Sequence, residues 1–158
     1  MSKHKESENQ YLFKVNLKRR RSIWRTVLLH GDQTLDELHE VIFAAFDRYD
    51  EHLYCFYFPK ARQGRSASGK PPKEYRSPSG FDPTEGFEID NRYNAARARL
   101  DDLRLKVGQT FEYLFDFGDE WWHEIIVQGI GPSEPGGTYP RIVEKRLTSP
   151  PQYPESDE

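Results

Sequence analysis

The fold is decided by residues 11–46, which read YLFKVNLKRRRSIWRTVLLHGDQTLDELHEVIFAAF. Residues 11–17 alternate apolar and mostly polar side chains, which is the period of a half-buried strand. A charged turn follows at 18–22, and residues 23–30 have the composition of a second strand. This stretch therefore opens with a predicted β-hairpin. The apolar members of its first strand are Tyr11, Phe13, Val15 and Leu17.

A helix is predicted directly after the hairpin. Thr34 and Glu37 form a capping box, in which Thr34 caps the first turn and the Glu37 side chain reaches back. Apolar residues then recur at helical spacing, and we expect the helix to end near Asp47 or Arg48. Residues 53–58 are apolar on both faces and predict a buried strand. The apolar helix positions are Leu35, Leu38, Val41, Ile42, Ala45 and Phe46.

The rest of the chain predicts further strands joined by turns. Residues 60–80 are rich in Gly, Pro, Ser, Lys and Arg, which predicts a mobile loop or a binding arm. Two alternating stretches around Gly118-Asp119 predict a second hairpin. The remaining predicted segments are a short strand at 87–90, a short helix or turn at 94–103, hairpin strands at 111–117 and 121–127, and a strand at 139–143.

These elements predict one α+β domain over residues 11–148, with a mostly antiparallel sheet and one main helix packed on it. The hairpin-helix-strand opening is similar to that of a β-grasp fold. We expect residues 1–10 to be a disordered N-terminus and residues 149–158 a disordered acidic tail. The apolar share of 35% is low, but ten Phe, nine Tyr and three Trp can each bury a large area in the core.

The composition excludes several classes of protein. The single cysteine, Cys55, cannot form an internal disulfide, and no Cys pair is present to bind zinc. We therefore expect no metal site and no cofactor. No apolar run approaches the roughly 18 residues of a membrane-spanning helix, and the first ten residues lack a signal sequence. We expect a cytoplasmic protein without membrane association.

The second predicted hairpin carries the most suggestive group of chemical side chains. Carboxylates near an imidazole can bind a divalent ion or perform acid–base chemistry. Alternation, however, places Asp116 opposite its aromatic neighbours and His123 among apolar residues. We therefore favour a structural turn in which Asp119 bonds turn amides and His123 is half-buried, and we assign no catalytic residue. The candidate cluster comprises Asp116, Asp119, Glu120, His123 and Glu124.

Basic residues gather in two places although the net charge is −3. One is the predicted hairpin tip, and the other is the loop at 60–80. Lys and Arg beside aromatic rings can bind phosphates and bases, although a dedicated nucleic-acid module is usually basic overall. The candidate nucleic-acid contacts are Lys18, Arg19, Arg20, Arg21, Arg62, Arg65, Lys70 and Lys73.

Three linked motifs resemble those of a known family. Residues 23–27 (IWRTV) resemble its early IWRRV strand, and residues 34–42 (TLDELHEVI) match its TLxELHxVI helix. Residues 115–124 (FDFGDEWWHE) resemble its YDFGDxWxHE hairpin. Residues 139–141 and Pro150-Pro151 resemble its closing segment. On these motifs the chain resembles the plasmid pRiA4b ORF-3-like proteins.

The resemblance implies a single α+β domain of unknown molecular role. Some relatives are labelled resolvases or are joined to DNA-binding domains, and neither label establishes an activity. Relatives often carry a Cys where Ser149 stands, so this chain has no thiol at that position.

Our leading hypothesis is a non-catalytic binding or adaptor module for protein or nucleic acid. The sequence is equally consistent with an accessory protein of a mobile element. The alternative is a small hydrolase or metal-dependent enzyme centred on Asp116, Asp119 and His123.

Overall fold

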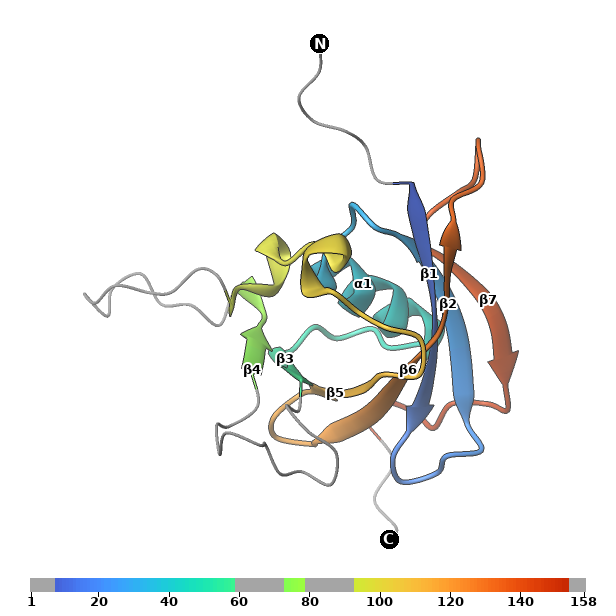
Figure 1. Ribbon diagram of the computed structural model, residues 1–158. Helices are drawn as coiled ribbons and strands as arrows, with labels where there is room; N and C mark the ends of the chain where they lie inside the picture. Colours follow the sequence, from blue (N-terminus) through green and yellow to red (C-terminus); the bar gives the residue numbers. More distant parts are fainter. Residues whose placement is uncertain (1–7, 59–72, 79–92, 154–158) are drawn as a thin grey trace, which may run out of the picture.

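Seven strands form one antiparallel sheet in the computed structural model, which describes residues 8–58, 73–78 and 93–153 (Figure 1). The sheet order is β4-β3-β5-β6-β1-β2-β7. The helical elements are α1 (Leu35–Ala45) and two short 3-10 turns, η5 (Ala95–Arg97) and η6 (Leu100–Leu103). The strands are β1 (Asn9–Leu17), β2 (Trp24–His30), β3 (Tyr54–Phe58), β4 (Lys73–Arg76), β5 (Thr110–Phe115), β6 (Trp121–Pro132) and β7 (Arg141–Arg146).

The predicted α+β class is wrong, because the chain adopts a largely β fold. α1 has only eleven residues and ends at Ala45. Two positions later, the φ of Asp47 is 58°, a left-handed conformation that an α-helix does not contain. The predicted helix or turn at 94–103 forms only η5 and η6. The β-grasp analogy also fails, because β1 pairs antiparallel with both β2 and β6.

In the described residues, no helix is long and apolar enough to span a bilayer.

One face of the sheet and α1 enclose the core (Figure 1). The predicted capping box is present: the Glu37 amide donates to the Thr34 hydroxyl, and the Thr34 amide donates to the Glu37 carboxylate. Each large apolar side chain buried between α1 and the sheet contributes roughly 1.5–3 kcal/mol to the stability of the fold. The fully buried residues at this interface include Phe13, Val15, Val27, Leu29, Leu35, Leu38 and Ile42.

Aromatic rings fill the part of the core next to β3 and β5. Phe111 stacks on Phe58 with ring centroids 4.3 Å apart, and it meets Phe13 edge-on at 6.0 Å. Phe56 and Tyr113 lie side by side at 4.7 Å. Rings of this size bury much area per residue, which is how a chain with a low apolar share builds a continuous core.

β1 lies inside the sheet, between β2 and β6. It pairs with β2 through a short turn, and it pairs with β6 from Asn9↔Pro132 to Leu17↔His123. A register shift at Leu12/Phe13 marks a bulge in this second pairing. The two edges of the sheet are the short strands β4 and β7.

The boundaries of the domain differ from the predicted ones. β1 begins at Asn9, within the segment expected to be a disordered N-terminus. Residues 149–153 belong to the folded domain, because Gln152 is only 1% exposed. Lys73–Arg76, within the predicted loop at 60–80, form β4. The rest of that loop and the predicted strand at 87–90 lie mostly or wholly outside the described residues.

Candidate metal centre

His39 points from α1 into the interior of the protein. It follows Leu35 by four positions, so both side chains lie on the inward face of the helix. His39 is 1% exposed, and its ring stacks on Tyr54 with centroids 4.0 Å apart. A partner for each ring nitrogen stabilises a buried imidazole, since an unpaired polar atom in the core is costly.

Both nitrogens of His39 have partners. Nδ1 lies 2.5 Å from the Tyr113 hydroxyl on β5, and Nε2 lies 3.1 Å from Oε1 of Glu51. Burial lowers the pKa of His39 to about 3, so the ring is neutral at pH 7 and carries one proton. If the Tyr113 hydroxyl donates to Nδ1, that proton sits on Nε2 and is donated to Glu51. The contact with Glu51 is therefore a hydrogen bond rather than an ion pair.

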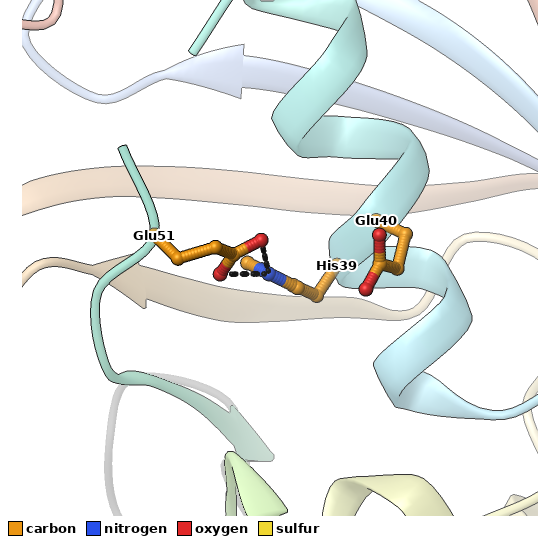
Figure 2. A group of neighbouring side chains, drawn as sticks. All are labelled: His39, Glu40 and Glu51. Atoms are coloured by element: carbon orange, nitrogen blue, oxygen red, sulfur yellow. Dashed lines mark hydrogen bonds and ion pairs between the residues drawn. The ribbon is translucent and has the colours of Figure 1, made fainter. Parts of the chain in front are cut away.

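Two glutamates lie near His39: Figure 2 shows the Glu51 carboxylate at the ring and Glu40 beside His39 on the helix. One potential ligand atom from each of these three residues lies within 4.8 Å of the other two. Glu40 is the next residue of α1, whereas Glu51 comes from the segment between α1 and β3. Both glutamates are exposed, and the Glu51 side chain is 57% exposed. We call this group the His39 centre; it opens to solvent on its acidic side.

The surroundings of the His39 centre are strongly negative. Burial, together with the charges of Glu40 and Asp36, raises the pKa of Glu51. Asp36 also accepts a hydrogen bond from the Tyr54 hydroxyl. Asp36, Glu40 and Glu51 thus repel one another, and a cation bound between Glu40 and Glu51 would relieve that repulsion.

One imidazole nitrogen and two carboxylates form a donor set suited to a divalent cation. Coordination through Nε2 of His39 requires the ring proton to lie on Nδ1, from which it is donated to the Tyr113 hydroxyl. A phenolic hydroxyl can donate or accept, so Tyr113 provides a partner for either tautomer. The His39 centre can therefore pass from a hydrogen-bonded to a metal-bound arrangement without leaving Nδ1 unpaired.

A second histidine lies beside this centre. His52 directly follows Glu51, and its Nε2 lies 2.6 Å from the Tyr153 hydroxyl. The same nitrogen lies 3.5 Å from Oδ2 of Asp116. His52 thus connects the segment before β3 with the β5–β6 turn and with residues 149–153.

Asp116 organises the turn between β5 and β6. Its φ of 68° is a left-handed conformation, which Asp adopts more readily than most residues. Its Oδ1 accepts hydrogen bonds from the amides of Gly118 at 3.0 Å and Asp119 at 3.2 Å. We predicted the turn-bonding role for Asp119; the structure places it at Asp116 and leaves Asp119 exposed.

The five residues of the predicted hairpin cluster do not converge on one site. Glu120 accepts a hydrogen bond from the Trp122 indole, and Glu124 pairs with Arg21. His123 is fully rather than half buried, and its Nδ1 donates to a backbone carbonyl of β5 at 3.3 Å. Its Nε2 has no hydrogen-bond partner in the described part of the chain. The cluster therefore divides between a turn, the outer sheet surface and the core.

The predicted nucleic-acid contacts at the hairpin tip are partly engaged within the chain. Lys18 pairs with Glu112, and its ammonium lies 5.8 Å from the Trp122 ring centroid. Arg21 pairs with Glu124. These pairings reduce the positive charge that the tip presents to a partner. Of the other candidates, Arg19, Arg20 and Lys73 are exposed, and Arg62, Arg65 and Lys70 lie outside the described residues.

Neither Glu51 nor Tyr113 was predicted from the sequence to be a site residue. The His39-Glu40 pair matches half of a zincin motif, but that motif requires a second His at a fixed spacing. No spacing rule links the pair to a loop glutamate and a strand tyrosine. The only local signal is a His-Glu pair on the helix followed by a carboxylate shortly after its end.

The model of one protein family, described as plasmid pRiA4b ORF-3-like protein, matches residues 9–153. This chain belongs to that family. The resemblance of its sequence motifs is confirmed. The matched range begins with β1 and ends with residues 149–153, so the family's domain includes the segment that carries Gln152.

Two proteins similar to this pRiA4b ORF-3-like chain, one in sequence and one in fold, carry no assigned function. It is 31% identical over 130 residues to the uncharacterized protein y4hQ of Sinorhizobium fredii (strain NBRC 101917 / NGR234). That match covers 82% of this chain and 58% of the relative, so the chain spans less than two thirds of its length. A crystal structure of the protein of unknown function MM3350 from Methanosarcina mazei Go1 has a TM-score of 0.68 and 24% identity, covering 92% of this chain and 74% of that one. This likeness supports the fold alone.

Proposed function

We propose that this pRiA4b ORF-3-like domain is a binding module that holds one divalent cation at His39, Glu40 and Glu51. The observation that carries the proposal is the convergence of three potential ligand atoms within 4.8 Å around a neutral imidazole. His39 and Glu40 are neighbours on α1, and Glu51 reaches the His39 ring from the segment that follows the helix. This proposal replaces our expectation from the sequence that the chain has no metal site.

The donor set indicates which cation fits. Two carboxylates balance the charge of a divalent ion, and an imidazole nitrogen favours Mn²⁺ or Zn²⁺ over Ca²⁺, whose ligands are oxygen atoms. Three protein ligands leave coordination positions open, and the exposed Glu51 places these on the solvent side. Open positions accept water or an anionic group of a partner.

A bound cation gives the leading hypothesis, a non-catalytic binding or adaptor module, a defined contact point. The cation would offer open coordination positions on an acidic surface, where a carboxylate of a protein or a phosphate of a nucleic acid could complete its coordination. Direct binding of nucleic acid by the hairpin tip has less support, because Lys18 and Arg21 are paired with acids. The mobile-element role and the cytoplasmic location remain predictions.

The alternative, an enzyme centred on Asp116, Asp119 and His123, has less support. Asp116 is occupied with turn amides and His52, Asp119 is exposed, and the His123 ring lies within the core. Asp116 and Asp119 share one turn, but the third member of the proposed centre, His123, is shielded from solvent.

Isothermal titration calorimetry of chelator-treated protein with Mn²⁺ and Zn²⁺ tests the proposed site. We expect one cation per chain. Glu40→Gln and Glu51→Gln each remove a charge at nearly constant size, and each should weaken binding at least about tenfold, since even changes outside the ligand shell can cost that much. Glu144→Gln, which alters an exposed acid on β7, is the matched control and should bind like the wild type.

Two results would overturn the proposal. One is failure of the wild-type protein to bind either cation at one per chain. The other is wild-type affinity in both the Glu40→Gln and Glu51→Gln variants.

A further inference from the structure

Residues 149–153, which we call the Gln152 strap, lie against the segment between α1 and β3. Gln152 is 1% exposed. Its Oε1 accepts hydrogen bonds from the amides of Tyr49 at 2.8 Å and Asp50 at 3.1 Å. Its Nε2 donates to the Asp50 carbonyl at 2.8 Å. One buried side-chain amide thus satisfies three backbone groups.

Contacts on both sides of Gln152 hold the strap in place. The Arg48 guanidinium donates to the Pro150 carbonyl at 3.3 Å. The Trp121 indole donates to the Gln152 carbonyl at 3.3 Å. The guanidinium of Arg48 also lies 4.3 Å from the centroid of the Trp121 ring. The strap therefore joins the end of α1 to the start of β6.

The segment held by the strap carries Glu51, the part of the His39 centre that does not lie on the helix. This segment forms no helix or strand. In the described part of the chain, the hydrogen bonds to the backbone of Tyr49 and Asp50 come from Gln152. Because Glu51 follows Asp50 directly, fixing these peptide groups restricts where the Glu51 carboxylate can lie.

Glutamine is the side chain suited to this position. Glutamate would lack the N–H donor for the Asp50 carbonyl and would bury a charge. Asparagine keeps the amide but is one methylene shorter. Alanine would leave two amides and a carbonyl without their partner, at a cost in free energy for each buried group.

We propose that Gln152 is a positioning residue for Glu51, so that docking of the Gln152 strap and cation binding stabilise each other. This inference rests on the proposed cation site. If the docked strap raises the affinity for the cation, linkage requires that the cation favour the docked strap by the same factor. A cation bound beside Glu51 would then stabilise the docked Gln152 strap, which lies about one hundred residues away in the chain.

Two readouts on full-length Gln152→Ala and Gln152→Asn variants test the coupling. Hydrogen exchange followed by NMR reports strap docking without a cation, and we expect the Tyr49 and Asp50 amides to exchange faster in both variants. Calorimetry with Zn²⁺ reports the site, and we expect affinity to fall at least about tenfold. In the wild type, saturating Zn²⁺ should slow exchange of the same two amides.

Gln128→Ala removes an exposed glutamine of β6 and is the matched control, which should change neither readout. Circular dichroism verifies that each variant is folded. If Gln152→Ala does not fold, the test relies on Gln152→Asn. Faster exchange with wild-type Zn²⁺ affinity would overturn the coupling and leave the cation site standing. Failure of the wild-type protein to bind Zn²⁺ or Mn²⁺ would overturn the site itself and the coupling with it.

Discussion

His123 is a histidine whose ring is held neutral inside the core. Its ring meets that of Phe46, the C-cap residue of α1, at 5.2 Å and that of Tyr113 on β5 at 5.0 Å. Burial first, and then the nearby charge of Arg48, lowers the pKa of His123 to about 3. The unfolded chain has no such environment, so its His123 protonates near the ordinary pKa of 6.5.

We expect His123 to make the domain less stable as the pH falls from 6.5 towards 3. In this window the unfolded state binds a proton at His123 that the folded state does not. The free energy of unfolding should therefore fall by about 1.4 kcal/mol per pH unit through this group. Urea unfolding across the window measures the slope, which His123→Gln should reduce by that amount. Equal slopes in the two proteins would contradict a neutral buried ring.

At the scale of single residues, the sequence predicts whether a side chain lies in a turn or in the sheet better than it predicts which residue that side chain contacts. The Gly118-Asp119 pattern predicts a turn, but the left-handed conformation of Asp116 decides which carboxylate meets the turn amides. Alternation predicts a half-buried His123, whereas full burial depends on Phe46, which packs on the ring from the C-cap of α1. Such features depend on residues far apart in the chain, which no local pattern contains.

The two tryptophans that open β6 have opposite environments. Trp121 is 7% exposed and contacts Arg48 and the Gln152 strap. Trp122 is only partly buried on the other face of the sheet, where its ring lies 5.5 Å from that of Tyr57.

Trp121→Ala should cost about 3–5 kcal/mol of unfolding free energy, because it removes a buried ring and the indole that anchors the strap. Trp122→Ala is the matched control and should cost about 1 kcal/mol, as expected of a surface-facing side chain. Urea unfolding of both variants compares them. Similar losses in the two would show that the faces of β6 are not distinguished as described.

At the scale of elements, local patterns predict the two hairpins and the capped helix close to β1, β2, α1, β5 and β6. They do not predict β4, because Lys73–Arg76 contains a single apolar residue and becomes a strand by pairing with β3. The error in fold class has the same origin. The balance of helix and sheet depends on pairings between distant strands, whereas the helical signal of α1 is local.

For the whole molecule, charge argues against strong direct binding of nucleic acid. The net charge is −3, and two bases of the hairpin tip are paired with acids of the sheet. We expect cation-free protein to bind labelled single-stranded DNA weakly, with an affinity that falls steeply between about 50 and 200 mM salt. Fluorescence anisotropy measures both quantities. Tight binding that persists at the higher salt would contradict this electrostatic account.

The candidate site is a property of the whole molecule too. Tyr113 lies 74 positions from His39, and the sheet order that places β5 beside β3 brings it under the helix. Gln152 lies a hundred residues from the backbone it holds. The His39-Glu40 pair alone does not predict a metal site, because it lacks the second His of a zincin motif; Tyr113 joins it only through the sheet topology.

The position of β1 inside the sheet has a consequence for how the chain folds. Its partner β6 follows it by more than a hundred residues, so this pairing must close a very long loop. The entropy of closure is lost before the contacts compensate for it, and proteins dominated by such pairings fold in milliseconds to seconds. Until β6 arrives, the β1–β2 hairpin exposes an unpaired edge on which a second nascent chain can add a strand. The aggregation hazard of this domain therefore lies in the interval before β6 docks, more than in its folded surface.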